Sequence, residues 1–199
     1  SVIKFDIEEV GIPIPFRWGK CKLATTSYGH GITTTILQLA NAYSIIANGG
    51  YKINPTLIKK KSKIKNKKIL NNDVSKKINP ILRKIVTTKE GTASLANVDG
   101  YQVGGKTGTA QTSIVGGYSN KKINTFASVF PSSNPKYVFI VMLDEPKTNS
   151  EYIYNYRDGS GIKYKGTPFN TAGWTSVEVV GQIIEKIGPI LATKYNEVY

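Results

Sequence analysis

The stretch "TFASVFPSSNPKYVFIVML" (residues 125–143) decides the fold class. Its two apolar runs, Thr125–Phe130 and Tyr137–Leu143, are rich in β-branched and aromatic residues, as strands are. The segment between them, "PSSNPK", has the composition of a hairpin turn. Strands joined by a tight turn run antiparallel, so the stretch predicts an antiparallel hairpin.

Apolar residues recur at helical spacing in three other places. The first helix is predicted over Thr33–Asn48, where a threonine cluster offers an N-cap and a Gly-Gly pair follows the end. A second is predicted from about Asp73 to Thr88, with Pro80 marking either a kink or the start. The third is predicted over Ser176–Ala192.

The remaining segments carry weaker signals. Residues 1–31 are predicted to be irregular, residues 51–70 to form a short hairpin around a lysine-rich turn, and Tyr101–Thr107 to be a further strand. Residues 147–174 are polar and rich in glycine and tyrosine, which predicts a long surface loop. Helices, then consecutive strands, then a helix indicate an α+β fold, an antiparallel sheet with packed helices.

The chain of 199 residues is strongly basic, with a formal net charge of +14 that comes mostly from lysine. The run "KKKSKIKNKK" (residues 59–68) has the density that phosphate contacts use. It lacks interleaved aromatic residues and no nucleic-acid-binding motif surrounds it. A solvated hairpin is therefore the favoured interpretation, nucleic-acid binding is the alternative, and no nucleic-acid partner is expected.

The single cysteine, Cys21, excludes an internal disulfide and a multi-cysteine metal site, and the lone His30 cannot complete a zinc site with it. No apolar run approaches the roughly 20 residues that span a bilayer. The only methionine is Met142, so Ser1 is not a natural start and the chain is expected to be a fragment or a processed product.

The stretch "GYQVGGKTGTAQ" (residues 100–111) fits two functions. Gly100, Gly105, Lys106 and Thr107 match the phosphate-loop pattern, and a downstream strand ends in two acidic residues, as a magnesium-binding strand would. A phosphate loop, however, needs a buried strand before it and a helix after it. The flanking sequences "TASLANVD" and "GTAQTSIVGGYSNKK" provide neither, so the ATPase interpretation is rejected.

The second interpretation is a strand edge that binds a peptide carboxylate. Lys106, Thr107 and Gly108 form the Lys-Thr-Gly motif of serine enzymes that react with penicillin. Lys106 supplies a fixed positive charge, and the hydroxyls of Thr107 and Thr109 can bind a carboxylate. A backbone N–H just past the motif can help hold an oxyanion. The glycines at 104, 105 and 108 are expected to keep the edge free of bulk, so that a substrate backbone can lie against it.

Three long stretches resemble one family. They are "ATTSYGHGITTTILQLANAYSIIANGG" (24–50), "VTTKEGTASLANVDGYQVGGKTGTAQ" (86–111) and "GGYSNKKINTFASVFPSSNPKYVFIVMLDEP" (116–146). Their order is similar to that in penicillin-binding transpeptidases, above all the monofunctional (class B), membrane-anchored class that makes septal peptidoglycan in bacterial division. The resemblance implies that residues 1–199 are the C-terminal part of such a transpeptidase (β-lactamase-like) domain, with 147–174 a surface loop insertion.

The family's nucleophile is expected outside this chain. Its chemistry needs Ser-x-x-Lys at a helix start, then Ser-x-Asn, then Lys-Thr-Gly. Four Ser-x-x-Lys matches exist, in lysine-rich, proline-containing or glycine-flanked turns: Ser62–Lys65, Ser119–Lys122, Ser133–Lys136 and Ser160–Lys163. Ser132-Ser133-Asn134 imitates the second motif but follows the third. Both missing motifs are expected upstream of Ser1, so this chain is expected to contain no catalytic residue.

The resemblance implies the rest of the function. The complete enzyme would be a serine D-Ala-D-Ala transpeptidase that crosslinks peptidoglycan stem peptides in cell-wall synthesis and division. It would bind β-lactams through Lys106, Thr107, Gly108 and Thr109, and it would use no metal and no cofactor. Other cell-division proteins are expected partners. The implied location is the extracytoplasmic face of the bacterial inner membrane, with the anchor outside this chain. A catalytically inactive scaffold of the same family is the alternative.

Overall fold

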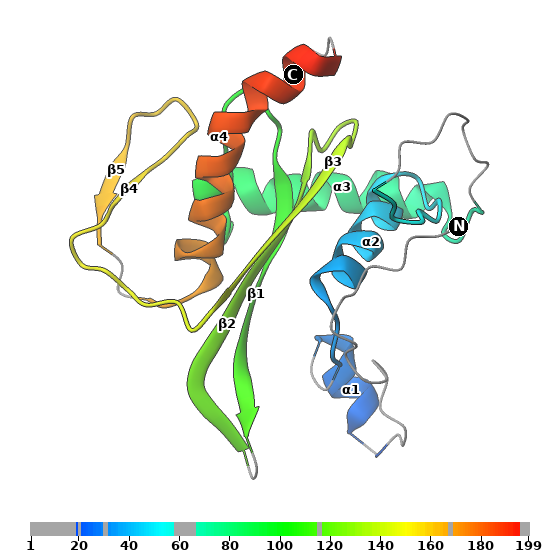
Figure 1. The fold of residues 1–199 in the computed structure, drawn as a ribbon, viewed down its shortest axis with the longest axis horizontal. Helices are drawn as coiled ribbons and strands as arrows, with labels where there is room; N and C mark the ends of the chain where they lie inside the picture. Colours follow the sequence, from blue (N-terminus) through cyan, green and yellow to red (C-terminus); the bar gives the residue numbers. More distant parts are fainter. Residues whose placement is uncertain are drawn as a thin grey trace.

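The computed structural model describes residues 19, 21–29, 32–57, 67–114, 117–166 and 169–195. The described helices and strands are α1 (Lys22–Ser27), α2 (Ile36–Ala47), α3 (Asn72–Thr87), η1 (Ser94–Ala96), β1 (Gly104–Ile114), β2 (Gly117–Phe130), β3 (Tyr137–Asp144), β4 (Ile153–Asn155), β5 (Lys163–Lys165), η2 (Ala172–Trp174) and α4 (Ser176–Tyr195). Figure 1 shows the long strands between α4 and α2, with α3 crossing behind them.

The predicted hairpin is the centre of the fold. Strands β1, β2 and β3 form an antiparallel sheet in that order, with Thr107 opposite Phe126 and Phe126 opposite Val141. β1 is therefore an edge strand among the described residues. The final five residues of β2, Phe126–Phe130, are all buried, because this part of the strand is covered on both faces. The α+β prediction is confirmed.

Two apolar clusters cover the two faces of the sheet. Phe126 and Phe130 pack with Val177, Val180 and Ile184 of α4. Val129 packs with Ala47 of α2 and Leu82 of α3 on the other face. Because successive side chains of a strand point to opposite faces, β2 joins the two clusters.

The three predicted helices are present as α2, α3 and α4, and their ends differ from the prediction by a few residues. Thr35 caps α2 in a reciprocal capping box, in which its hydroxyl accepts from the Gln38 N–H and the Gln38 side chain accepts from the Thr35 N–H. Asn71 caps α3. Pro80 lies inside α3 and so does not mark its start. α1 occupies part of the segment predicted to be irregular; none of its residues is buried, so it has no apolar stripe to detect.

The third predicted strand was misplaced. β1 begins at Gly104 rather than Tyr101 and continues to Ile114. The backbone before it is turned, because Gly100 and Gln102 both have positive φ angles. Beyond Thr109 the strand pairs with the polar start of β2, where Gln111 lies opposite Lys122. That half of the hairpin is solvated on both faces, so its sequence lacks the apolar alternation that reveals a strand.

The segment 147–174, predicted to be a long surface loop, is mostly exposed but contains short regular elements. The segment contains the hairpin β4–β5 and the short helix η2, and Tyr154, Arg157 and Ala172 in it are buried. The Tyr154 ring packs edge-on against Trp174, with ring centroids 5.1 Å apart. Tertiary contacts of this kind involve residues distant in sequence, which a local composition count does not detect.

Two further sequence predictions concern the basic segment and the membrane. A single antiparallel bridge joins Tyr51 to Lys68, in line with a hairpin over 51–70, but residues 58–66 at its predicted turn lie outside the described residues. Within the described part of the chain, no helix is both long enough and apolar enough to cross a bilayer.

Candidate substrate-binding strand

The Lys-Thr-Gly motif lies on the edge strand β1, as the sequence predicted. Alternation along the strand separates its side chains between the two faces of the sheet. Thr107 and Thr109 lie opposite Phe126 and Asn124 of β2, on the α4 face. Lys106 lies opposite Ala127, on the face that α2 and α3 cover.

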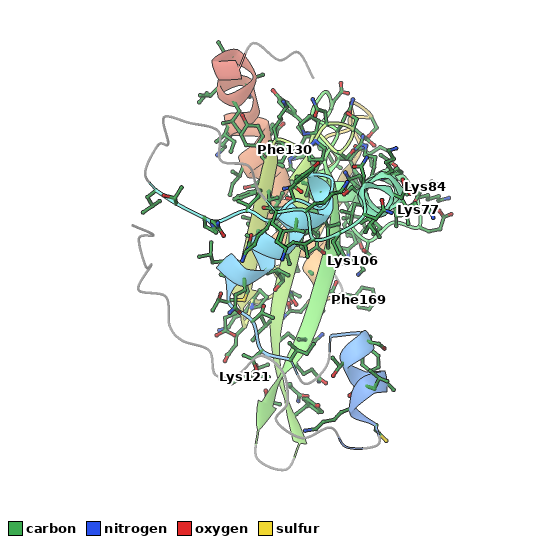
Figure 2. The ribbon with its side chains drawn as sticks, turned by 90° about the vertical axis from the view of Figure 1, so that its right-hand side faces the viewer. Lys77, Lys84, Lys106, Lys121, Phe130 and Phe169 are labelled. Carbon is green, nitrogen blue, oxygen red and sulfur yellow. The ribbon has the colours of Figure 1, made fainter. Side chains whose placement is uncertain are left out.

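Lys106 is an exposed cation at this edge. Its Nζ donates to the Thr107 backbone oxygen at 2.7 Å, so the ammonium folds back onto the backbone of its own strand. Figure 2 shows Lys106 beside β1, apart from Lys77 and Lys84 on α3. The charge and the hydroxyl pair thus approach one segment of the strand from opposite faces.

Thr107 is oriented by a second threonine. Its Oγ1 lies 2.8 Å from the Oγ1 of Thr92, and either hydroxyl can be the donor. Thr92 belongs to the Glu-Gly-Thr-Ala turn that follows α3. A Cβ at Gly91 would lie 2.2 Å from the Ile85 backbone oxygen, so only glycine lets the turn pack this closely against α3. The turn lies within the stretch 86–111 that resembles the family, but its sequence does not indicate the contact with Thr107.

Thr109 is held by a residue far along the sequence, Ala172. Its Oγ1 accepts a hydrogen bond from the Ala172 backbone N–H at 3.1 Å. Phe169, three residues before Ala172, is 60% exposed. The prediction of a surface loop over 147–174 gave no sign of the contact between Thr109 and Ala172, because the two residues are 63 positions apart.

The glycines of the motif serve internal packing more than substrate access. A Cβ at Gly105 would lie 2.6 Å from both the Ala127 backbone oxygen and the Phe126 ring. A Cβ at Gly104 would meet the α3 backbone at 3.0 Å. Only Gly108 is open, with its nearest neighbour 3.9 Å away on Thr125. The expectation that all three keep the edge free for a substrate is therefore corrected: Gly104 and Gly105 are required by the neighbouring elements.

None of the described Ser-x-x-Lys matches lies in a helix. Ser119–Lys122 lies in β2, Ser133–Lys136 in the turn before β3, and Ser160–Lys163 in the turn after β4 and the first residue of β5. Ser62–Lys65 falls outside the described residues. Ser132, in the imitation of the second motif, is buried, and its N–H donates to the Gln102 backbone oxygen.

The groups at the described site are suited to binding a peptide rather than to attacking its amide bond. The site offers two hydroxyls, an ammonium and a strand edge, which together suit an extended peptide that ends in a carboxylate. Among the described residues, no three His, Cys, Asp or Glu side chains gather where a metal ion could bind.

An antiparallel sheet packed between helices, with Lys-Thr-Gly on its edge strand, is what the penicillin-binding transpeptidase family was expected to show. Comparison with known proteins identifies the same family. The family model for the penicillin-binding protein transpeptidase domain matches residues 1–160. The chain therefore belongs to that family.

Two curated relatives are named as a peptidoglycan D,D-transpeptidase and a sporulation protein. The probable peptidoglycan D,D-transpeptidase FtsI of Caulobacter vibrioides is 30% identical over 203 residues, which cover 96% of this chain and 32% of that protein. The stage V sporulation protein D of Bacillus subtilis is 36% identical over 159 residues, which cover 73% of this chain and 24% of that protein. The chain thus spans a third or less of these two relatives.

Solved structures agree with the fold. The transpeptidase domain of Burkholderia pseudomallei penicillin-binding protein 3 superposes with a TM-score of 0.69 at 28% identity, covering 87% of this chain and 47% of that one. Penicillin-binding protein 3 of Mycobacterium tuberculosis, solved in complex with aztreonam, gives a TM-score of 0.68 at 26% identity, covering 92% of this chain and 40% of that one.

Proposed function

We propose that this chain is the carboxylate-binding part of a serine D,D-transpeptidase that crosslinks peptidoglycan stem peptides. The observation that carries the proposal is the edge strand β1, where the Thr107 and Thr109 hydroxyls share one face and the Lys106 ammonium folds over from the other. The family membership and the names of the relatives support the same activity.

The strand binds the substrate in the proposed reaction. The terminal carboxylate of a D-Ala-D-Ala stem accepts hydrogen bonds from Thr107 and Thr109, and the charge of Lys106 stabilises it. The stem backbone lies along the unpaired edge of β1 as an added strand. The Thr109 N–H, just past the motif, helps to hold the oxyanion that forms when the scissile carbonyl is attacked.

The nucleophile acts from outside these 199 residues. Its serine oxygen attacks the D-Ala-D-Ala carbonyl, an ester forms, and the terminal D-alanine leaves with the proton on its nitrogen. An amine of a neighbouring stem then attacks the ester, forms the crosslinking amide and returns the proton to serine. A β-lactam imitates the stem because its anionic group takes the place of the carboxylate and its strained amide takes the place of the scissile bond.

The proposal also includes the cellular role, the location and the protein partners. A role in septal peptidoglycan synthesis, a location at the extracytoplasmic face of the inner membrane and partners among the division proteins follow from the sequence resemblance. The sporulation and FtsI-type names of the relatives support a division-related role.

Covalent labelling with a fluorescent penicillin tests the activity. The 199-residue chain is expected to remain unlabelled, whereas the open reading frame extended upstream through a Ser-x-x-Lys helix is expected to be labelled at that serine. Thr107→Val in the extended protein should slow labelling at least about tenfold, because a hydrogen bond to a charged group contributes about 1.5–3 kcal/mol. An extended protein that carries both motifs and is never labelled would favour the inactive scaffold.

A further inference from the structure

A buried asparagine lies directly behind the proposed carboxylate site. Asn124 of β2 is opposite Thr109 in the strand register and is fully buried, with 0% of its surface exposed. Its Nδ2 donates to the Asn170 Oδ1 at 3.1 Å and to the Thr175 Oγ1 at 2.9 Å. One side chain of the sheet thus holds both ends of residues 170–175, which we call the return arm.

Asn170 makes two further contacts at the start of the return arm. Its Nδ2 donates to the Pro146 backbone oxygen, just after β3. Its backbone oxygen accepts from the Lys122 Nζ at 3.1 Å. The arm is therefore tied to β2 and to the end of β3 at one residue.

An ion pair anchors the hairpin that precedes the return arm. The Arg157 guanidinium donates to both carboxylate oxygens of Glu178 on α4, each at 2.8 Å. Both side chains are about 95% buried, with 4% and 5% exposed. This pair fixes the β4–β5 hairpin to α4, so the segment that precedes the return arm is also held in place.

The contact with the site is the Ala172 N–H, in the middle of the return arm, which donates to the Thr109 Oγ1 at 3.1 Å. A hydroxyl has one proton to donate, and a hydroxyl that accepts from a backbone N–H keeps that proton for another partner. The bond therefore leaves Thr109 able to donate to an anion at the strand edge.

We propose that Asn124 and Asn170 are positioning residues for substrate recognition. They hold the return arm so that the Ala172 N–H fixes the Thr109 hydroxyl as a donor to the terminal carboxylate of the stem peptide. This inference rests on the proposed function, because it assumes that β1 binds that carboxylate. It assigns the segment 147–174 a part in selecting substrates that end in a free carboxylate.

Binding of a small peptide to the 199-residue chain tests the inference without the nucleophile. The probes are N-acetyl-D-Ala-D-Ala and its C-terminal amide, titrated while amide shifts of the ¹⁵N-labelled protein are followed. Wild-type protein is expected to prefer the acid, and Thr109→Val to lower that preference about tenfold. Asn170→Ala is expected to lower it as much and to leave amide binding unchanged, and the double variant Thr109→Val/Asn170→Ala to lower it no further.

The control is Asn149→Ala, the same change in the same segment at an exposed residue whose side chain caps only its own turn. It is expected to keep the wild-type preference. Should Asn170→Ala fail to fold, Thr175→Val replaces it, because valine keeps a similar shape without the hydroxyl that Asn124 contacts. The same loss of preference, at a smaller size, is expected of that variant.

The outcomes separate the two proposals. An Asn170 variant that folds and keeps the full preference for the acid overturns the positioning role, as does one that weakens acid and amide equally. If wild-type protein does not prefer the acid and Thr109→Val changes nothing, the proposed function of β1 is what has failed.

Discussion

At the scale of single residues, the Arg157–Glu178 pair is the most consequential interaction outside the site. Removing two charges from water is costly, and the cost is recovered only when the pair is well hydrogen-bonded. Here the guanidinium binds both carboxylate oxygens, the Leu95 backbone oxygen and a second carboxylate, that of the exposed residue Glu185. Glu178 also accepts from the Tyr152 hydroxyl. The network is therefore close to fully satisfied.

Loss of one partner should be much worse than loss of both charges. Arg157→Met is expected to lower the free energy of unfolding by about 3–5 kcal/mol, because the Glu178 carboxylate is left buried without a counter-charge. The double variant Arg157→Met/Glu178→Gln is expected to recover part of that loss. Urea denaturation of the 199-residue chain measures both. Lys121→Ala, which breaks an exposed pair with Glu145, is the control and should leave the midpoint unchanged.

Tyr152 gives the stability a dependence on alkaline pH. Burial, together with the hydrogen bond to Glu178, raises the pKa of Tyr152 to about 12 from an ordinary value of 10.0. The unfolded chain therefore loses this proton first as the pH rises, so the stabilisation is fully present below pH 10 and is lost between pH 10 and about 12.

Tyr152→Phe removes that titration. The variant is expected to start from a lower stability, because the hydroxyl contacts are gone, and to lose less between pH 10 and 12 than the wild-type protein. Denaturant midpoints at half-unit pH steps test this. Parallel loss in the two proteins would contradict the assignment.

At the scale of elements, the sequence of β1 predicts that it is a strand but not which residues pack against it. The Lys-Thr-Gly letters predicted an edge strand, and β1 is an edge strand in the described sheet. The same letters did not reveal why the glycines are there, because the reason is the Phe126 ring and the α3 backbone, which approach from elsewhere in the chain. Spacing within one strand contains no information on which neighbour will lie behind it.

Two glycine-to-alanine substitutions compare the stability effect of a packed position with that of an open one. Gly105→Ala is expected to destabilise the protein by about 1–3 kcal/mol, because its methyl group would overlap the Phe126 ring and the Ala127 backbone oxygen. Gly108→Ala is expected to stay within about 0.5 kcal/mol of wild type, because nothing lies closer than 3.9 Å. Thermal unfolding of the two variants measures the difference. Equal destabilisation would show that the packing around Gly105 is described wrongly.

At the scale of the whole molecule, the two faces of the sheet are unequally covered. The α4 face is closed over a large apolar cluster that also includes Leu95 and Val103. On the other face, only Ala47 of the residues of α2 is buried, and the apolar side chain of Ile36 is 45% exposed. An exposed apolar patch is typical of an interaction surface.

The 199-residue chain is therefore expected to self-associate through α2. Ile36→Gln should lower both the sedimentation-detected association and the fluorescence of a dye that binds apolar surface. Ile190→Gln, at a residue 67% exposed near the end of α4, is the matched control and should change neither. A chain that remains monomeric at high concentration would contradict this prediction.

The sequence by itself determined the class of fold, the three long helices, the central hairpin and the presence of a strand at Lys106 and Thr107, but not the bounds of that strand, which runs over Gly104–Ile114. Each is a local signal: an apolar period, a cap, a turn or a motif with its flanks. The tertiary structure alone decided that Thr92, Ala172 and Asn124 surround that strand, that 147–174 is an anchored hairpin and arm, and that Gly105 is there for Phe126. Thr92 and Ala172 are 15 and 63 residues from the threonines they contact, and a hydrogen bond across such a separation leaves no periodicity in the sequence, because it is set by how the elements pack.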